Sequence, residues 1–261
     1  MSNTRDSKER FSATIEYYHR YRPDYPETVI QMLIDQCGLN NAKIIADVGM
    51  GTGIFTKQLL ESGYTVFGVE PNPDMRNAAI QFLSKYKNFK AVDGSSELTQ
   101  LSDHSVDIIT AAQAFHWFNQ EKTKQEFIRI LKPQGWVILV WNLRENNTAF
   151  MQDYENLLQR YGKDYQEVAA DKTVQSKDIG IEKFFLPYKV KIKTFPHHQE
   201  VDWDGCRGRL LSTSYTPKQG EAGYEAMLDA AQKIFDKHQH QGKVDFTYET
   251  KVYFGQLKSA P

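Results

Sequence analysis

The chain has 261 residues, of which 40% are hydrophobic and 25% are charged, and its formal net charge is −1. This composition is ordinary for a globular protein and excludes disorder as the main state. The near-neutral charge favours neither nucleic acid nor an anionic membrane as a partner. No stretch approaches the roughly 20 apolar residues of a membrane span, and the polar N-terminus lacks a signal-peptide core. We expect a cytoplasmic protein with Cys37 and Cys206 as two reduced thiols, the alternative being a single disulfide between them.

The first half of the chain alternates short apolar segments with amphipathic ones. In chain order we predict a strand at 43–48, a helix at 53–63, a strand at 64–70, a helix at 72–86, strands at 89–94 and 106–113, a helix at 120–132 and a strand at 135–142. The strands are almost continuously apolar, which is typical of strands that are buried on both faces. The pattern therefore predicts an α/β protein with a parallel sheet and helices on both faces.

The second half is less regular. Here we predict a helix at 148–162, a strand at 188–195, a helix at 223–235 and a final strand at 244–257. The two strands alternate polar and apolar residues, so we expect them to form an antiparallel edge of the sheet. The polar stretch at about 163–180 is a candidate lid. No linker is rich in Pro, Gly or Ser, so we predict one domain over 1–261, with a core at about 26–145, an N-terminal cover at 11–26 and a C-terminal cap at about 146–243 before the final strand.

A glycine-rich loop follows the first predicted strand in "ADVGMGTGIFTKQLL" (46–60). Its glycines, Gly49, Gly51 and Gly53, let the backbone approach a ligand closely, and the helix that follows aims its free N–H groups there. Glu70 stands at the end of the second strand, 23 residues after Asp47. An acid at about this offset can accept hydrogen bonds from both hydroxyls of a ribose. The loop and the acid together predict a nucleoside site.

Two residues separate the possible ligands of this loop. The dinucleotide fingerprint GxGxxG requires a glycine where this chain has Ile54. Asp47, just before the loop, would repel a pyrophosphate and attract an ammonium group. The loop therefore suits an adenosine compound with an amine and a carboxylate better than it suits NAD. An NAD-dependent oxidoreductase stays as an alternative.

Four segments, "DVGMGTG", "VEPNPDM", "DGSSE" and "RILKPQGWVILV", resemble the class I S-adenosylmethionine-dependent methyltransferases. The segments "AFHWF" and "FSATIEYYHRYRPDYP" resemble the small-molecule branch that includes trans-aconitate methyltransferase-like proteins. The resemblance covers about residues 11–145. It implies a Rossmann-like fold with seven strands, S-adenosyl-L-methionine as cofactor and S-adenosyl-L-homocysteine as product. It also implies in-line methyl transfer to an O, N or C atom of a small-molecule acceptor.

The resemblance assigns cofactor contacts residue by residue. The glycines would line the methionine part with Asp47 near the amine, and Glu70 would bind the ribose. Many relatives have "GDAE" after the third strand, where this chain has "GSSE" (94–97), so Ser95 replaces the acid that contacts the adenine. The implied contacts are Asp47, Gly49, Gly51, Gly53, Glu70, Pro71, Met75, Ser95, Ser96, Gln113 and Phe115.

The aromatic run "FHWF" (115–118) follows the fourth strand, at the carboxyl edge of the sheet, where such folds bind ligands. Its rings could exclude water from the reacting atoms and interact with a positive sulfonium. His116 could accept a proton from a hydroxyl or amine acceptor. The alternatives are plain core packing for the rings and a histidine bonded to a backbone carbonyl.

Other residues are candidates for contact with the acceptor. Tyr18 and Arg22 lie in "YYHRYRPDYP" (17–26), whose counterpart in the family folds over the cofactor. The alternative is an extended segment that packs its rings on the sheet. Asn142 and Arg144 follow the fifth strand and could instead lie in a solvated loop. The remaining candidates are Trp117 and Tyr215.

The histidines at 197, 198, 238 and 240 have no carboxylate or cysteine at a zinc-like spacing, so we expect no metal site. A non-catalytic module that binds S-adenosylmethionine is a second alternative to the enzyme. The sequence leaves open the acceptor, its methylated atom and the oligomeric state.

Overall fold

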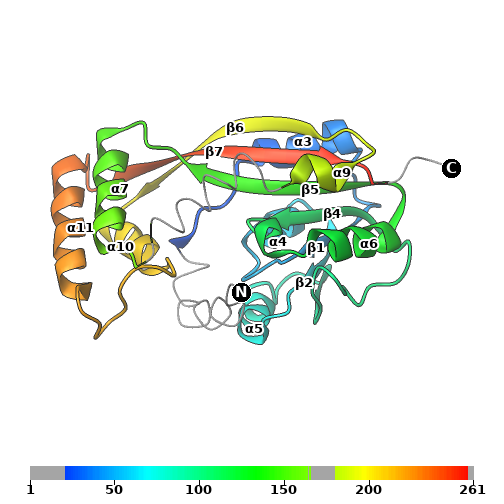
Figure 1. Cartoon of the computed structure of the whole chain (residues 1–261), viewed down its shortest axis with the longest axis horizontal. Coiled ribbons are helices and arrows are strands. Elements are labelled where there is room, and N and C mark those ends of the chain that lie inside the picture. Colours follow the sequence, from blue (N-terminus) through cyan, green and yellow to red (C-terminus); the bar gives the residue numbers. More distant parts are fainter. Residues whose placement is uncertain (1–20, 164, 166–179, 258–261) are drawn as a thin grey trace. The chain divides into compact units, whose positions relative to one another are not determined.

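The computed structural model describes residues 21–163, 165 and 180–257 (Figure 1). Tyr18 and most of the predicted lid lie outside these residues. The chain forms two compact units, each built from several segments. The described part of the sheet unit comprises residues 24–142, 180–195 and 250–257, and that of the second unit comprises 21–23, 143–163, 165 and 196–249.

The sheet has seven strands in the order β3-β2-β1-β4-β5-β7-β6. Their bounds are β1 Ile44–Val48, β2 Thr65–Val69, β3 Phe89–Val92, β4 Val106–Ala112, β5 Leu131–Arg144, β6 Lys191–Val201 and β7 Val244–Gly255. Strands β3, β2, β1, β4 and β5 pair in parallel, and β7 with β6 forms the antiparallel edge. The predicted fold class is therefore confirmed.

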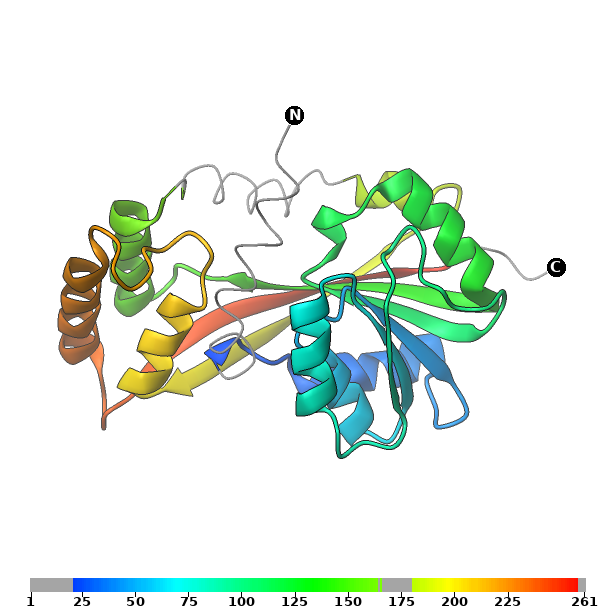
Figure 2. The same ribbon diagram turned by 90° about the horizontal axis from the view of Figure 1, so that it is seen from below.

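Helices cover both faces of the sheet in the sheet unit, with α3 and α6 on opposite sides in Figure 2. On one face, Leu33 of α3 and Leu59 of α4 share a buried core with Ile45 of β1. On the other, Phe127 of α6 packs edge-to-face against Phe184 of α9, at 6.1 Å between ring centroids. The helices of this unit are α3 Glu27–Cys37, α4 Ile54–Glu61, α5 Pro73–Phe82, the short η1 Phe115–Trp117, α6 Gln120–Ile130 and α9 Ile181–Phe185.

The second unit packs three helices around an aromatic core. They are α7 Ala149–Tyr161, α10 Trp203–Leu211 and α11 Tyr224–His238. Phe246 of β7 lies 5.0 Å from Phe150 and 4.9 Å from Tyr154, both of α7, as ring-centroid distances. Thr148 caps α7 by accepting a hydrogen bond from the Met151 amide.

The element boundaries differ from the prediction mainly at β5 and β6. β5 covers 131–144 where we predicted 135–142, and β6 covers 191–201 where we predicted 188–195. β6 continues through Pro196, which a central strand would not tolerate. β6 is an edge strand, where proline is tolerated. Helices α3, α9 and α10 were not predicted.

None of the helices within residues 21–163, 165 and 180–257 is both long and apolar enough to cross a membrane.

Candidate functional site

The glycine loop joins β1 to α4 at the carboxyl edge of the sheet. Gly49 has φ +71°, and a Cβ on it would lie 2.6 Å from Cβ of Ala114, just before the aromatic run. Gly51 has φ +58°, and a Cβ there would meet no atom within 4 Å. Both conformations favour glycine. The loop thus packs closely against the aromatic segment at Gly49 and offers open backbone at Gly51.

Asp47 is a buried carboxylate at the end of β1. It accepts hydrogen bonds from Thr56 Oγ1 of α4 at 2.5 Å and from Thr110 Oγ1 of β4 at 2.8 Å. Parallel pairing of β1 with β4 places Asp47 directly opposite Thr110. Burial raises the pKa of Asp47 to about 6, although both hydroxyls oppose the shift. A cation beside this carboxyl would favour its ionised form.

Glu70 lies against the glycine loop, and its contact with a ribose stays a prediction. Its Oε2 accepts a hydrogen bond from the Gly51 amide at 3.0 Å, and its Oε1 accepts one from the Asn72 amide at 2.9 Å. Arg76 donates to the Glu70 carbonyl at 2.7 Å and pairs with Asp93 at 3.0 Å. The carboxylate is therefore fixed beside the open position of the loop.

The predicted adenine neighbours lie at the start of α5. Pro71 is exposed, whereas Met75 is buried in the first turn. Asn72 caps this helix by accepting hydrogen bonds from the amides of Asp74 and Met75. The sequence analysis did not single out Asn72, but an Asn before Pro73 is a typical helix-start signal.

Ser95 and Ser96 follow β3 in a loop tied to α6. Ser96 Oγ accepts a hydrogen bond from Thr123 Oγ1 of α6 at 2.9 Å. Ser95 Oγ accepts one from the Glu97 amide at 3.3 Å, and Glu97 in turn accepts one from the Asn119 amide at 3.0 Å. These contacts position the loop itself, and an adenine contact by either serine stays a prediction.

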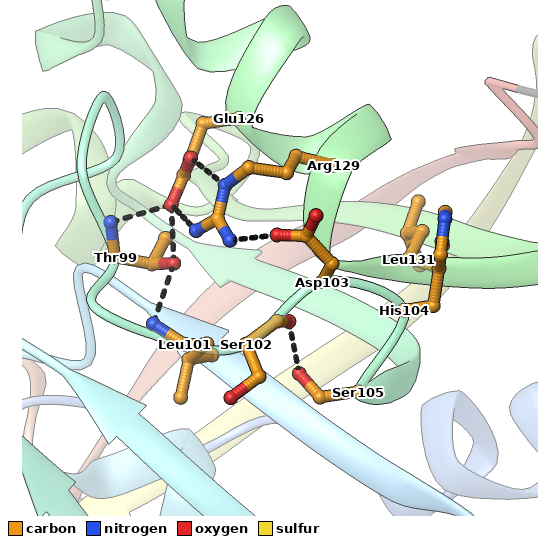
Figure 3. Close-up of polar contacts among 9 residues, drawn as sticks. All are labelled: Thr99, Leu101, Ser102, Asp103, His104, Ser105, Glu126, Arg129 and Leu131. Atoms are coloured by element: carbon orange, nitrogen blue, oxygen red, sulfur yellow. Dashed lines mark hydrogen bonds and ion pairs between the residues drawn. The ribbon is translucent and has the colours of Figure 1, made fainter.

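A second set of polar contacts links the connection between β3 and β4 to α6, as Figure 3 shows. Glu126 of α6 accepts hydrogen bonds from the Thr99 amide at 2.7 Å and from Thr99 Oγ1 at 2.5 Å. Arg129 donates to Glu126 at 2.8 Å and 2.7 Å, and to Asp103 at 2.6 Å. Burial alone would raise the pKa of Glu126, but hydrogen bonds from Arg129 and Thr99 outweigh it and lower the pKa.

The aromatic run divides between the core and the surface. Phe115 is fully buried and packs against Phe184 at 4.8 Å and Phe118 at 5.8 Å between ring centroids. Trp117 is 58% exposed, which is unusual for so large an apolar side chain. Gln113, just before the run, has φ +55° and donates from Nε2 to the Asn142 carbonyl at 3.1 Å. A positive φ in a glutamine marks local strain at this strand end.

His116 lies between Phe115 and Trp117, and its ring centroid is 4.7 Å from that of Trp117. Burial lowers its pKa to about 4, so the imidazole is neutral at pH 7. Its Nδ1 is buried and has no hydrogen-bond partner within residues 21–163, 165 and 180–257. The alternative of a histidine held by a backbone carbonyl therefore does not apply at Nδ1.

The candidates for acceptor contact do not all fall in one unit. Asn142 belongs to the sheet unit, where its Nδ2 donates to the Asp24 carbonyl at 2.8 Å and its Oδ1 accepts from Thr250 Oγ1 at 2.6 Å. Because Asn142 is only 9% exposed, the alternative of a solvated loop is wrong for it.

Arg22, Arg144 and Tyr215 belong to the second unit. Arg144 forms an ion pair with Glu155 and donates to the Tyr165 hydroxyl at 2.8 Å. Tyr215 is buried, with its ring centroid 5.1 Å from that of Tyr165. Arg22 donates to the Ser212 carbonyl at 3.0 Å.

Among the described residues, no group of three or more His, Cys, Asp or Glu side chains could hold a metal ion.

Comparison with known proteins indicates a methyltransferase. A family model described as a methyltransferase domain matches residues 46–139, which contain the glycine loop, Glu70 and the aromatic run. The chain is 31% identical over 245 residues to an uncharacterized methyltransferase of Schizosaccharomyces pombe, a match that covers 93% of this chain and 95% of that protein.

Solved structures share the fold. One, provisionally named a type II methyltransferase from Anaeromyxobacter dehalogenans, matches with a TM-score of 0.67 at 18% identity, over 92% of this chain and 99% of that one. Another is a phosphoethanolamine N-methyltransferase of Haemonchus contortus in complex with S-adenosylhomocysteine. It matches with a TM-score of 0.52 at 11% identity, over 97% of this chain and 57% of that one. At these identities, the likeness indicates the fold alone.

Proposed function

We propose that this chain, which belongs to the class I S-adenosylmethionine-dependent methyltransferases, is active on a small molecule. It would transfer a methyl group from S-adenosylmethionine to an O, N or C atom of that molecule. The chain is a methyltransferase, so neither an NAD-dependent oxidoreductase nor a non-catalytic binding module is favoured. The cofactor, the acceptor class and the roles of individual residues are the proposed part. Membership of the trans-aconitate-like branch stays a prediction.

One observation carries the proposal: Glu70 Oε2 is bonded to the Gly51 amide at the open position of the glycine loop. A ligand that reaches this point meets a fixed carboxylate, which can accept hydrogen bonds from vicinal ribose hydroxyls. Thr52 adds a buried hydroxyl that has no hydrogen-bond partner among the residues that the structure describes, and the loop is followed by the N-terminus of α4. Donors of this kind suit the carboxylate of a methionine group.

The bound cofactor supplies an electrophilic methyl group on a positive sulfonium. The chain's own part is to bind, orient and exclude water. Asp47 would favour the amine through its charge, and Glu70 would hold the ribose. We assign Gly49, Gly53, Pro71, Met75, Ser95, Ser96, Gln113 and Phe115 to the surroundings of the cofactor, as the family resemblance implies.

His116 would act as a neutral imidazole. With a pKa of about 4 it can take a proton only transiently, so we assign it first to accepting a hydrogen bond from a hydroxyl or amine acceptor. A carboxylate acceptor would need no such base. Exposed Trp117 would shield the reacting atoms from water. Contacts of the acceptor with Tyr18, Arg22, Asn142, Arg144 and Tyr215 remain proposals.

Calorimetric titration with S-adenosylmethionine, S-adenosylhomocysteine and NAD tests the cofactor proposal. We expect micromolar binding of the first two by the wild type and at least about tenfold weaker binding by Glu70→Ala, because two charge-assisted hydrogen bonds are lost. Glu121→Ala, which changes an exposed acid in α6, is the matched control. Binding of NAD alone would refute the proposal in favour of the oxidoreductase.

A further inference from the structure

Two buried aspartates of the sheet differ in what offsets their charge. Asp107, in β4, pairs with Lys43 at 3.1 Å and with Lys132 at 2.7 Å. Asp47, in β1, is 1% exposed, and among the residues that the structure describes it has no cation beside it. A buried carboxylate without a positive partner is costly. Asp47 is therefore suited to a cation that arrives with a ligand.

Two threonines from different elements hold the Asp47 carboxylate. Thr56 of α4 donates to Oδ2 at 2.5 Å, and Thr110 of β4 donates to Oδ1 at 2.8 Å. Both threonines are fully buried, so these hydrogen bonds are shielded from water. Each carboxylate oxygen has two lone pairs, so one acceptor position on each oxygen remains for a further donor. The hydroxyls thus fix the carboxylate and leave it able to bind an ammonium group.

The other titratable groups around Asp47 are engaged elsewhere or uncharged. In the sheet, Asp47 lies opposite a glycine of β2 and a threonine of β4. On α4, Lys57 and Glu61 pair with each other at 3.2 Å. Glu70, after β2, bonds to the glycine loop, and His116, after β4, is neutral at pH 7. Within the described part of the chain, no charged group contributes to the pKa of Asp47.

We propose that Thr56 and Thr110 are positioning residues of the cofactor site, which fix the Asp47 carboxylate as the receiver of the cofactor amine. The role of Asp47 toward the amine rests on the proposed function, whereas the hold of the threonines on Asp47 does not. Hydroxyl donors favour the ionised form of a buried carboxylate, and that form attracts an ammonium group. Burial raises the pKa of Asp47 to about 6, and the hydrogen bonds from both threonines limit the rise.

Carbon-13 NMR of protein labelled at the aspartate carboxyl carbons tests the hold of the threonines without any cofactor. Asp47→Asn identifies the resonance of Asp47. Thr110→Val and Thr56→Val keep the shape of each side chain and remove its hydroxyl, so each should raise the pKa of Asp47 by about 1. An unchanged pKa in both valine variants would overturn the proposal.

Two further variants serve as controls for these measurements. Thr110→Ser keeps a hydroxyl at the same position and should leave the pKa of Asp47 close to that of the wild type. Thr216→Val removes a buried hydroxyl that bonds to the Leu210 carbonyl at 3.1 Å, and it should also leave that pKa unchanged. An equal rise in Thr216→Val would attribute the effect to the loss of any buried hydroxyl and would overturn the proposal.

Calorimetric titration with S-adenosylhomocysteine and methylthioadenosine tests the role toward the amine. Methylthioadenosine keeps the adenine and the ribose but lacks the amine and the carboxylate. If the pKa of Asp47 rises from about 6 to about 7, its ionised fraction falls about fivefold at pH 6 and scarcely changes at pH 8. Thr110→Val should therefore bind S-adenosylhomocysteine about fivefold more weakly at pH 6 and nearly like the wild type at pH 8. Its binding of methylthioadenosine should be unchanged at both pH values.

The failure of this proposal can be told from the failure of the cofactor proposal. Equal weakening of both ligands by Thr110→Val, or equal weakening at pH 6 and pH 8, would show that the threonine is purely structural. If the wild type binds neither ligand while the pKa of Asp47 responds to both threonines, the cofactor proposal fails and the hold on Asp47 stands.

Discussion

At the scale of single residues, burial decides the chemistry of Asp47, just before the glycine loop, and of His116, in the aromatic run. His116 has a pKa of about 4 and is neutral at pH 7, while Asp47 has a pKa of about 6 and is largely ionised there. The sequence identified both residues as candidates but could not give either pKa. That depends on solvent exclusion by segments far apart in the chain.

Asp47 gives the first prediction, a pH-dependent cofactor affinity. In the folded protein the pKa of Asp47 is raised above its ordinary value of 3.8. The contribution of Asp47 to the free energy of unfolding is therefore complete below pH 3.8 and is lost as the pH rises through about 6. A shift of this size corresponds to about 3 kcal/mol between the two protonation states. An ammonium ligand favours the ionised form, so S-adenosylmethionine should bind more tightly at pH 7 than at pH 5.

Titrations at both pH values in Asp47→Asn and in the control Asp35→Asn check this. We expect the pH dependence to disappear in the first variant and to persist in the second, whose exposed carboxylate lies on α3. An unchanged pH dependence in Asp47→Asn would place the titrating group elsewhere.

At the scale of elements, the connection from β3 to β4 depends on α6. Glu126 bonds to Thr99 in this connection and to Arg129 on its own helix (Figure 3). Ser96 and Thr123 form a second link between the same segments. The loop that carries Ser95 and Ser96 is thus held by a helix that begins more than twenty residues later. Sequence patterns locate the helix but not the carboxylate's partners.

We predict that Glu126→Gln lowers the free energy of unfolding at pH 7 by about 1.5–3 kcal/mol, because charge-assisted hydrogen bonds to Arg129 are lost. The folded pKa of Glu126 is depressed, so its contribution is present above the ordinary pKa of 4.5 and is lost as the pH falls through the folded value. Urea unfolding at pH 7 and pH 3 measures both effects. Glu121→Gln, an exposed change on the same helix, should be neutral, and equal losses in both variants would contradict the role of the network.

At the scale of the whole molecule, the chain forms two compact units with separate cores. The sheet unit contains Glu70 and the glycine loop, whereas Tyr154 belongs to the second unit. The predicted division of the chain into one domain with a cover and a cap stays a prediction, because its boundaries are not tested by the packing within either unit.

Binding of the cofactor product should stabilise the unit that binds it. S-adenosylhomocysteine at 100 times its dissociation constant should raise the free energy of unfolding of the binding unit by about 2.7 kcal/mol. Glu70→Ala should lose this stabilisation, and Tyr154→Phe should keep it. Scanning calorimetry of the three proteins with and without ligand provides the measurement. Stabilisation that persists in Glu70→Ala would remove that carboxylate from the site.

The sequence by itself determined the class of fold, the glycine loop and its acid. Periodic apolar segments, the three glycines and Glu70 are local signals, and parallel strands necessarily bring their carboxyl ends to one edge. Only the tertiary structure decided which side chains are buried and what they contact. Asn142, a candidate for acceptor contact, is bonded to Asp24 and Thr250. Hydrogen bonds between residues more than a hundred positions apart produce no periodic pattern in the sequence, and neither does the desolvation that accompanies them. They can therefore be identified only in the folded structure.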